Sequence, residues 1–135
     1  MTTRHILRTV VATAIGAALS QVATAEPPET VMITLRAKPG AEAALVQTIA
    51  RHYETARKLN LLHEETPHLT LQATDDQGKT YFIDIFTWRD ATVPDNAPGE
   101  ILAIWKEMNS LVETRGGRPA LDIVEVKPIA ITSAK

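Results

Sequence analysis

One histidine stands out in the sequence because it falls among apolar residues that recur with helical spacing. His52 shares this spacing with Leu45, Ile49 and Ala56, which places it near the centre of the apolar face of a helix. Burial desolvates a titratable side chain and can bring its pKa toward the working pH of an enzyme. His52 is therefore a candidate general base. The alternative is a core histidine that bonds a backbone carbonyl.

A carboxylate falls within an aromatic segment with strand-like alternation. Asp84 shares one face of this strand with three aromatic residues, which are Phe82, Phe86 and Trp88. A carboxylate among aromatic rings must be paired, hydrated or protonated. Asp84 could orient His52 or the hydroxyl of a ligand. It could equally pair with Arg36 or with a second copy of the chain at a dimer seam.

Further candidates could shape a pocket. Trp105 and Met108 lie one turn apart on a predicted helix and could form a wall for a flat aromatic ligand, with Trp88 nearby. Ordinary core packing would explain them equally well. Tyr53 and Asn109 flank the apolar faces of the two predicted helices and could donate hydrogen bonds at a pocket mouth, unless both are simply exposed to solvent.

The segment from His63 to His68 invites a metal interpretation that its spacing does not support. The zincin motif needs H-E-x-x-H on a helix, whereas here the two histidines are five residues apart and Pro67 interrupts a helix. A loose His/Glu site or a solvated acidic loop remains open, and no metal site is predicted. With no cysteine there is no disulfide or thiolate zinc site, and no glycine-rich phosphate loop occurs.

The elements that must position these residues follow from the change between strand and helix periodicity. In chain order they are strand 31–37, helix 41–59, strands 69–74 and 81–88 joined by a 75–79 turn, helix 101–112 and strand 120–126. The order β-α-β-β-α-β predicts an α+β, ferredoxin-like fold, in which two helices cover one face of a four-stranded antiparallel sheet.

The second face of this sheet is also apolar. Tyr81, Ile83 and Ile85 alternate with the aromatic face of the same strand, and no third helix is available to cover them. An apolar sheet face needs a second layer. The simplest supplier is a second copy of the chain, so we expect a homodimer.

The N-terminus is typical of a secretory signal peptide. Arg4 and Arg8 precede an uncharged apolar run over 9–19, and Ala23-Thr24-Ala25 is a small-x-small cleavage site. We expect cleavage after Ala25 and a periplasmic or secreted protein without a membrane-spanning segment. The predicted divisions are signal peptide 1–25, extended tether 26–30, one domain over 31–128 and a tail over 129–135.

Composition narrows the classes of partner. The chain of 135 residues suits one domain, and 44% apolar against 22% charged residues argues against disorder. Fourteen basic residues against sixteen acidic ones give a net charge of -2. This balance lacks the basic excess of nucleic-acid-binding proteins, so nucleic acid is not an expected partner.

Three segments carry a resemblance to a known family. They are Ala37-Lys38-Pro39-Gly40 after the opening strand, the strand Phe82-Ile83-Asp84-Ile85-Phe86-Thr87-Trp88-Arg89, and Ile104-Trp105-Lys106-Glu107-Met108 in the second helix. The chain thereby resembles the antibiotic biosynthesis monooxygenase-like branch of the dimeric α/β barrel superfamily. The resemblance implies a homodimer with a pocket between helices and sheet in each subunit. It also implies no metal or flavin cofactor, because the quinone-forming members oxidise a phenol that supplies its own electrons to oxygen.

A haem-degrading group of the same superfamily uses an Asn on the first strand, a Trp ending the third strand and a His on the second helix. Trp88 matches the Trp of this group. The first strand instead offers Met32, Thr34 and Arg36, and the second helix has no histidine. Haem degradation by that mechanism is therefore disfavoured.

The expected function is cofactor-independent oxidation of a small electron-rich aromatic, from phenol to quinone. His52 would be the base and Asp84 the orienting group, while Trp88, Trp105 and Met108 would shape the cavity. The alternative is a non-catalytic binding module for a small apolar or aromatic molecule, since the scaffold supplies a pocket whether or not a reaction follows. A third is a dimer whose pocket is closed by side chains.

Overall fold

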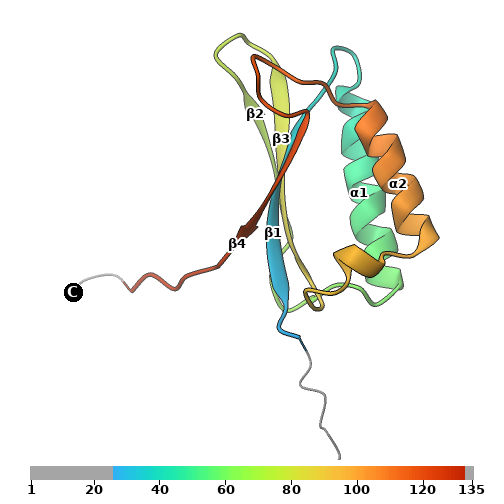
Figure 1. Ribbon diagram of the computed structural model, residues 1–135. Helices are drawn as coiled ribbons and strands as arrows, with labels where there is room; N and C mark the ends of the chain where they lie inside the picture. Colours follow the sequence, from blue (N-terminus) through green and yellow to red (C-terminus); the bar gives the residue numbers. More distant parts are fainter. Residues whose placement is uncertain (1–25, 133–135) are drawn as a thin grey trace, which may run out of the picture.

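Two helices cover one face of a four-stranded antiparallel sheet (Figure 1) in a computed structural model that describes residues 26–132. The elements are β1 (Glu29–Arg36), α1 (Glu42–Lys58), β2 (Leu69–Thr74), β3 (Thr80–Trp88), the short 3₁₀ helix η1 (Pro94–Asn96), α2 (Gly99–Ser110) and β4 (Leu121–Val126). The strand order is β2-β3-β1-β4. This confirms the predicted ferredoxin-like fold.

The strand register decides which residues share a row across the sheet. Ile33 of β1 is paired with Asp84 on β3 and with Ile123 on β4, and Thr70 of β2 is paired with Asp84. Directly paired residues project to the same face of a sheet. Thr70, Asp84, Ile33 and Ile123 therefore form one row on the side that carries the helices.

The core lies between this face and the helices. The aromatic face of β3 is buried, as the alternation predicted, and the buried residues of α1 are Leu45, Thr48, Ile49, His52 and Ala56. From α2 the core receives Ile101, Ile104 and Met108. The helical spacing that singled out His52 is confirmed, because that face of α1 is the one that packs on the sheet.

The opposite face of the sheet carries no helix (Figure 1). The register aligns Leu69, Ile85, Met32 and Val124 in one apolar row across all four strands. Leu69 and Val124 are 48% and 44% exposed. An apolar row of this length on a solvent-facing sheet marks a surface that another molecule can cover.

Two elements, β1 and α2, differ from the sequence prediction by two residues at one end or at both. β1 begins at Glu29, inside the expected tether, because Glu29 pairs with Trp88 at the end of β3. α2 ends at Ser110 and not at Val112, since the amide of Lys38 bonds the Leu111 carbonyl and Val112 forms a bridge with Ala37. These backbone groups bond the end of β1 in place of a further helical turn.

The proposed signal peptide, residues 1–25, lies outside the described residues. Within residues 26–132, no helix combines the length and apolar character needed to cross a membrane.

Candidate functional site

A cavity of about 230 Å³ lies between the sheet and the two helices. Six of the seven residues predicted for the site line it, namely His52, Asp84, Trp88, Trp105, Met108 and Asn109. Leu121 and Ile123 of β4 also line it, and Ile123 is 59% exposed although it projects to the helix side. The helices leave β4 uncovered, so the cavity is reached from the β4 side.

His52 is bonded to a side chain of the second helix. Its ring is 2% exposed, and the indole Nε1–H of Trp105 donates a hydrogen bond of 2.9 Å to its Nε2. The rings of Phe86 and Trp88 meet it edge-on, with centroids at 5.4 and 5.7 Å. Trp105 thus bonds Nε2, and among the described residues no backbone carbonyl is bonded to the His52 ring.

The environment keeps His52 neutral. Burial first, and then the electrostatic effect of nearby His68, lower its pKa from 6.5 to about 4. Because Nε2 accepts from Trp105, the proton of the neutral ring resides on Nδ1. A ligand in the cavity would thus meet a hydrogen-bond donor on His52, and the lone pair that a general base requires is already engaged.

Asp84 has partners that differ from those expected. It is 3% exposed; the Nε2 of His68 lies 2.6 Å from its Oδ1, and the Thr70 hydroxyl donates to the same oxygen at 2.7 Å. The expected pairs with His52 and Arg36 are not formed. Arg36 lies on the other face of the sheet, three residues after Ile33, and donates to the carbonyl of Pro119.

His68 is the functional residue that the sequence interpretation missed. It directly precedes β2, and Thr70, two residues further on, faces Asp84 across the strand pair. That spacing is the signal that could have found it. Its ring stacks on Tyr53, with centroids 3.8 Å apart and planes at 11°. Tyr53 thus packs against the His68 ring and does not line the cavity.

The His63–His68 segment does not assemble a metal site. The Nδ1 of His63 lies 3.1 Å from the Thr66 hydroxyl, whereas His68 turns toward Asp84. In the described part of the chain, no group of three or more His, Asp or Glu side chains is placed to hold a metal ion.

The remaining predicted residues form the walls and the mouth of the cavity. Trp88 and Met108 are buried, Trp105 is half-buried and Asn109 is exposed, which places Asn109 at the mouth. Glu29 adds a second carboxylate to the lining. Burial, then the charges of Glu125 and Asp95, raise its pKa.

No protein-family model matches the chain, and no curated protein matches it significantly. Several solved structures are similar to the chain. SnoaB from Streptomyces nogalater, a cofactor-independent oxygenase, is 15% identical with a TM-score of 0.56, over 77% of this chain and 95% of that one. PA3566 from Pseudomonas aeruginosa is 18% identical with a TM-score of 0.54, over 79% and 99%.

A protein of unknown function from Bacteroides thetaiotaomicron, described as a possible oxidoreductase, is 12% identical with a TM-score of 0.55, over 76% of this chain and all of that one. At these identities the likeness is one of fold. The ferredoxin-like fold expected from the sequence is confirmed, and SnoaB, a cofactor-independent oxygenase, is among the structures that share it.

Proposed function

We propose that the protein binds a small hydroxylated aromatic molecule in the 230 Å³ cavity and oxidises it with molecular oxygen, without a cofactor. One observation carries this proposal: a buried carboxylate, Asp84, lines a largely apolar cavity with one oxygen atom unused. Both hydrogen bonds to Asp84 go to Oδ1, and Oδ2 has no partner among the residues that the structure describes. The cavity is smaller than the roughly 300–1,000 Å³ of pockets for drug-sized ligands, which favours a small substrate.

The two polar points of the cavity have complementary roles. Asp84 Oδ2 accepts the hydrogen of a ligand hydroxyl, and the Nδ1–H of His52 donates to a ligand oxygen. Nδ1 has no hydrogen-bond partner within residues 26–132, and no fully buried polar side-chain atom there is unsatisfied, so Nδ1 is accessible from the cavity. The base role moves from His52 to Asp84, while His68 and Thr70 position the carboxylate.

The reaction balances with oxygen as the only co-reactant. Asp84 takes the phenolic proton, and the electron-rich phenolate reduces O₂. One oxygen atom replaces the hydrogen of a ring carbon and becomes a carbonyl, and the other leaves as water with the two hydrogens lost from O–H and C–H. The phenol becomes a quinone, and O₂ accepts four electrons. The protein supplies binding, deprotonation and a dry cavity.

A non-catalytic binding module is the second candidate. It is favoured by His52, which presents a donor to the ligand and, with a pKa of about 4, is a weak base. A cavity with one donor and one acceptor suffices to orient a small phenol or enol without a reaction.

We further propose that two copies pack through their helix-free sheet faces. The apolar row of Leu69, Ile85, Met32 and Val124 supports this arrangement, as does the superfamily fold.

We also propose that residues 1–25 direct export to the periplasm or the medium. Recovery of the protein from the periplasmic fraction with Glu26 as its first residue would test this, and retention of residues 1–25 would contradict it.

The experiment for the main proposal is a thermal-shift screen of the purified protein against naphthols, anthrones, quinones and flavonoids, with oxygen uptake recorded for each hit. Saturation at 100 times the Kd adds about 2.7 kcal/mol to the free energy of unfolding. Oxygen uptake that is lost in Asp84→Asn, with binding of the quinone product retained, supports the oxygenase. Binding without uptake supports the binding module, and no binding overturns both.

A further inference from the structure

The cavity between the sheet and the two helices has acidic side chains in its lining and, among residues 26–132, no lysine or arginine. Asp84 lies near its centre, in the row of Ile33, and Glu29 lies at the end where β1 begins. His52 is neutral, because its pKa is lowered to about 4, and the other lining residues are apolar, aromatic or amide side chains. Such a lining attracts a cation and repels an anion.

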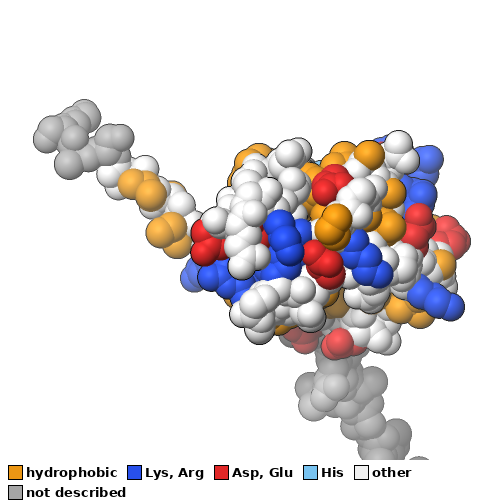
Figure 2. Space-filling model, turned by 90° about the horizontal axis from the view of Figure 1, so that it is seen from above, with side chains coloured by type: hydrophobic (Ala, Val, Ile, Leu, Met, Phe, Trp, Pro, Cys, Tyr) orange, Lys and Arg blue, Asp and Glu red, His pale blue; other side chains and the backbone are white. Residues whose placement is uncertain are grey.

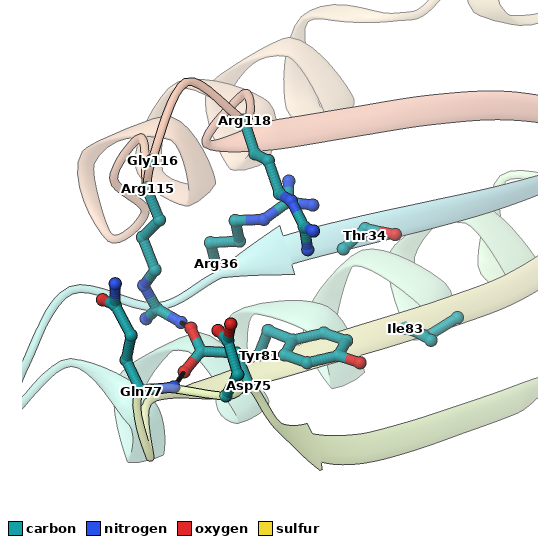
Figure 3. A pocket seen from close by; sticks show the side chains of 10 residues that line it. Thr34, Arg36, Asp75, Gln77, Tyr81, Ile83, Arg115, Gly116 and Arg118 are labelled. Atoms are coloured by element: carbon teal, nitrogen blue, oxygen red, sulfur yellow. Dashed lines mark hydrogen bonds and ion pairs between the residues drawn. The ribbon is translucent and has the colours of Figure 1, made fainter.

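Arginine side chains line a different pocket, on the helix-free side of the sheet at the end where β1 stops. This pocket of about 430 Å³ includes Arg36, Arg115 and Arg118 in its lining (Figure 3). Figure 2 looks onto this end of the molecule, where Lys and Arg side chains lie among Asp and Glu side chains. The floor of this pocket belongs to the face that we propose a second copy covers, so we assign it no ligand. None of the three arginines lines the acidic cavity.

Glu29 lies among other acidic side chains at its end of the cavity. It projects to the helix side of the sheet, as does Glu125 of β4, and Asp95 belongs to η1. Burial first, and then the charges of Glu125 and Asp95, raise the pKa of Glu29. Lys127, which follows β4, forms no ion pair with these carboxylates in the described part of the chain. A positive charge bound beside Glu29 would remove the repulsion among them.

The spacing of Glu29 and Asp84 sets the length of a ligand that can reach both. Glu29 pairs with Trp88, and Asp84 pairs with Ile33. Four residues of β1 therefore separate the two rows, which is roughly 13 Å at about 3.3 Å per residue. With a hydrogen bond of about 2.8 Å at each end, the two donor atoms of the ligand lie about 8 Å apart. An extended 4-hydroxyphenethylammonium ion has this separation between its hydroxyl oxygen and its nitrogen.

The cavity wall beside Glu29 also suits an ammonium group. Trp88, the strand partner of Glu29, lines the cavity, as do Phe86 and Pro94. The face of an aromatic ring attracts a positive charge, so a tryptophan next to a carboxylate forms a favourable site for an organic cation. The apolar surface between the two carboxylates can hold the aromatic ring of the ligand.

We propose that the substrate is a phenol that carries a positively charged amine, with its hydroxyl at Asp84 and its ammonium group at Glu29. This inference rests on the proposed binding of a hydroxylated aromatic molecule in the cavity, and it specifies the charge of that molecule. The proposed dimer contact uses the opposite face of the sheet, so it leaves this lining open. Glu29 then determines specificity, while Asp84 contacts the reacting hydroxyl.

Calorimetric titration of the purified protein at pH 7 with three phenols of different charge tests the proposal. They are tyramine, which is a cation, neutral 4-ethylphenol and the anion 3-(4-hydroxyphenyl)propionate. Tyramine should bind at least tenfold more tightly than 4-ethylphenol, because a hydrogen bond to a charged group contributes more than a neutral one. The propionate should bind most weakly of the three.

Substitution of Glu29 separates its charge from the shape of the cavity. Glu29→Gln keeps the size of the side chain, and it should weaken tyramine binding at least tenfold while leaving 4-ethylphenol binding unchanged. The matched control is Glu65→Gln, which removes the same charge from a side chain that is 92% exposed and lies outside the cavity. This control should keep the preference for tyramine.

Three results would overturn the proposal. Equal affinities of tyramine and 4-ethylphenol would show that the cavity does not select a cation, although it binds phenols as proposed. Loss of the preference for tyramine in Asp84→Asn, with the preference retained in Glu29→Gln, would place the ammonium group at Asp84. An absence of binding by all three phenols would overturn this inference together with the proposed function.

Discussion

The imidazole Nε2 of His68 lies 2.6 Å from Oδ1 of Asp84, which joins the residue before β2 to the centre of β3. Asp84 lines the cavity and His68 does not, and their side chains are 4% and 21% exposed, respectively. The contact engages Oδ1 of the carboxylate, whereas Oδ2 faces the cavity. This single contact gives both a stability prediction and a catalytic one.

Removing His68 should destabilise the protein. In His68→Ala the Asp84 carboxylate keeps only the Thr70 hydroxyl as a partner, and a buried charged group that loses a hydrogen bond costs about 1–3 kcal/mol. Urea unfolding should show that loss, and the effect should shrink in the Asp84→Asn background. His63→Ala is the control, because His63 bonds Thr66 and lies 3.8 Å from the exposed carboxylate of Glu65, both within its own loop. Equal losses for both variants would contradict the coupling.

Rates of oxygen uptake with any substrate found in the screen should show whether Asp84 or His52 is the base. Asp84→Asn keeps the shape of the side chain but cannot take a proton, and its rate should fall about 100-fold or more. His52→Gln keeps a donor toward the ligand and should lose much less. Asp122→Asn, at an exposed carboxylate of β4, serves as the control. The reverse ranking of the first two variants would restore His52 as the base.

Stability should depend on pH through His52. The folded-state pKa, about 4, lies below the ordinary value of 6.5, so between these values the unfolded state binds more protons and stability rises with pH. The contribution is complete above pH 6.5 and is lost as the pH falls through 4, by about 3 kcal/mol in all. Unfolding free energies measured from pH 7.5 to 3.5 should fall less steeply in His52→Phe. Parallel curves for both proteins would refute the assignment.

The tautomer of His52 should depend on Trp105. Since Trp105 Nε1–H donates to Nε2, long-range ¹H–¹⁵N spectra at pH 7 should show the proton on Nδ1. In Trp105→Phe the restraint is lost and the Nε2–H form should appear. Trp88→Phe is the matched control, because Trp88 meets the His52 ring by its edge without a hydrogen bond. An Nε2–H signal in the unaltered protein would contradict the hydrogen bond.

The helix-free face predicts the effect of surface charges on assembly. Val124→Lys and Leu71→Lys place a charge on this face, where the two side chains are 44% and 43% exposed, and burial of an unpaired charge opposes association. Sedimentation velocity should show a dimer for the unaltered protein and a monomer for each variant. Leu102→Lys, at a leucine of α2 that is 52% exposed, should leave the dimer intact. A monomeric unaltered protein would overturn the dimer proposal.

Local patterns in the sequence determined the elements and the faces they bury. Strand alternation placed Asp84 on the helix-facing side with Phe86, and helical spacing placed His52 in the core. Both inferences depend only on the periods of two and 3.6 residues, so they needed no knowledge of neighbouring segments. The wall and rim positions of Trp88, Met108 and Asn109 followed from the same periods.

Only the tertiary structure decided which side chains meet. The register that opposes Thr70 to Asp84 brings His68 to the carboxylate, 16 positions away in sequence, and the packing of α2 beside α1 brings Trp105 to His52 across 53 positions. α2 also ended early because backbone groups of β1 became its partners. Such contacts depend on how separate elements align, and residue periodicity within one element carries no information about that alignment.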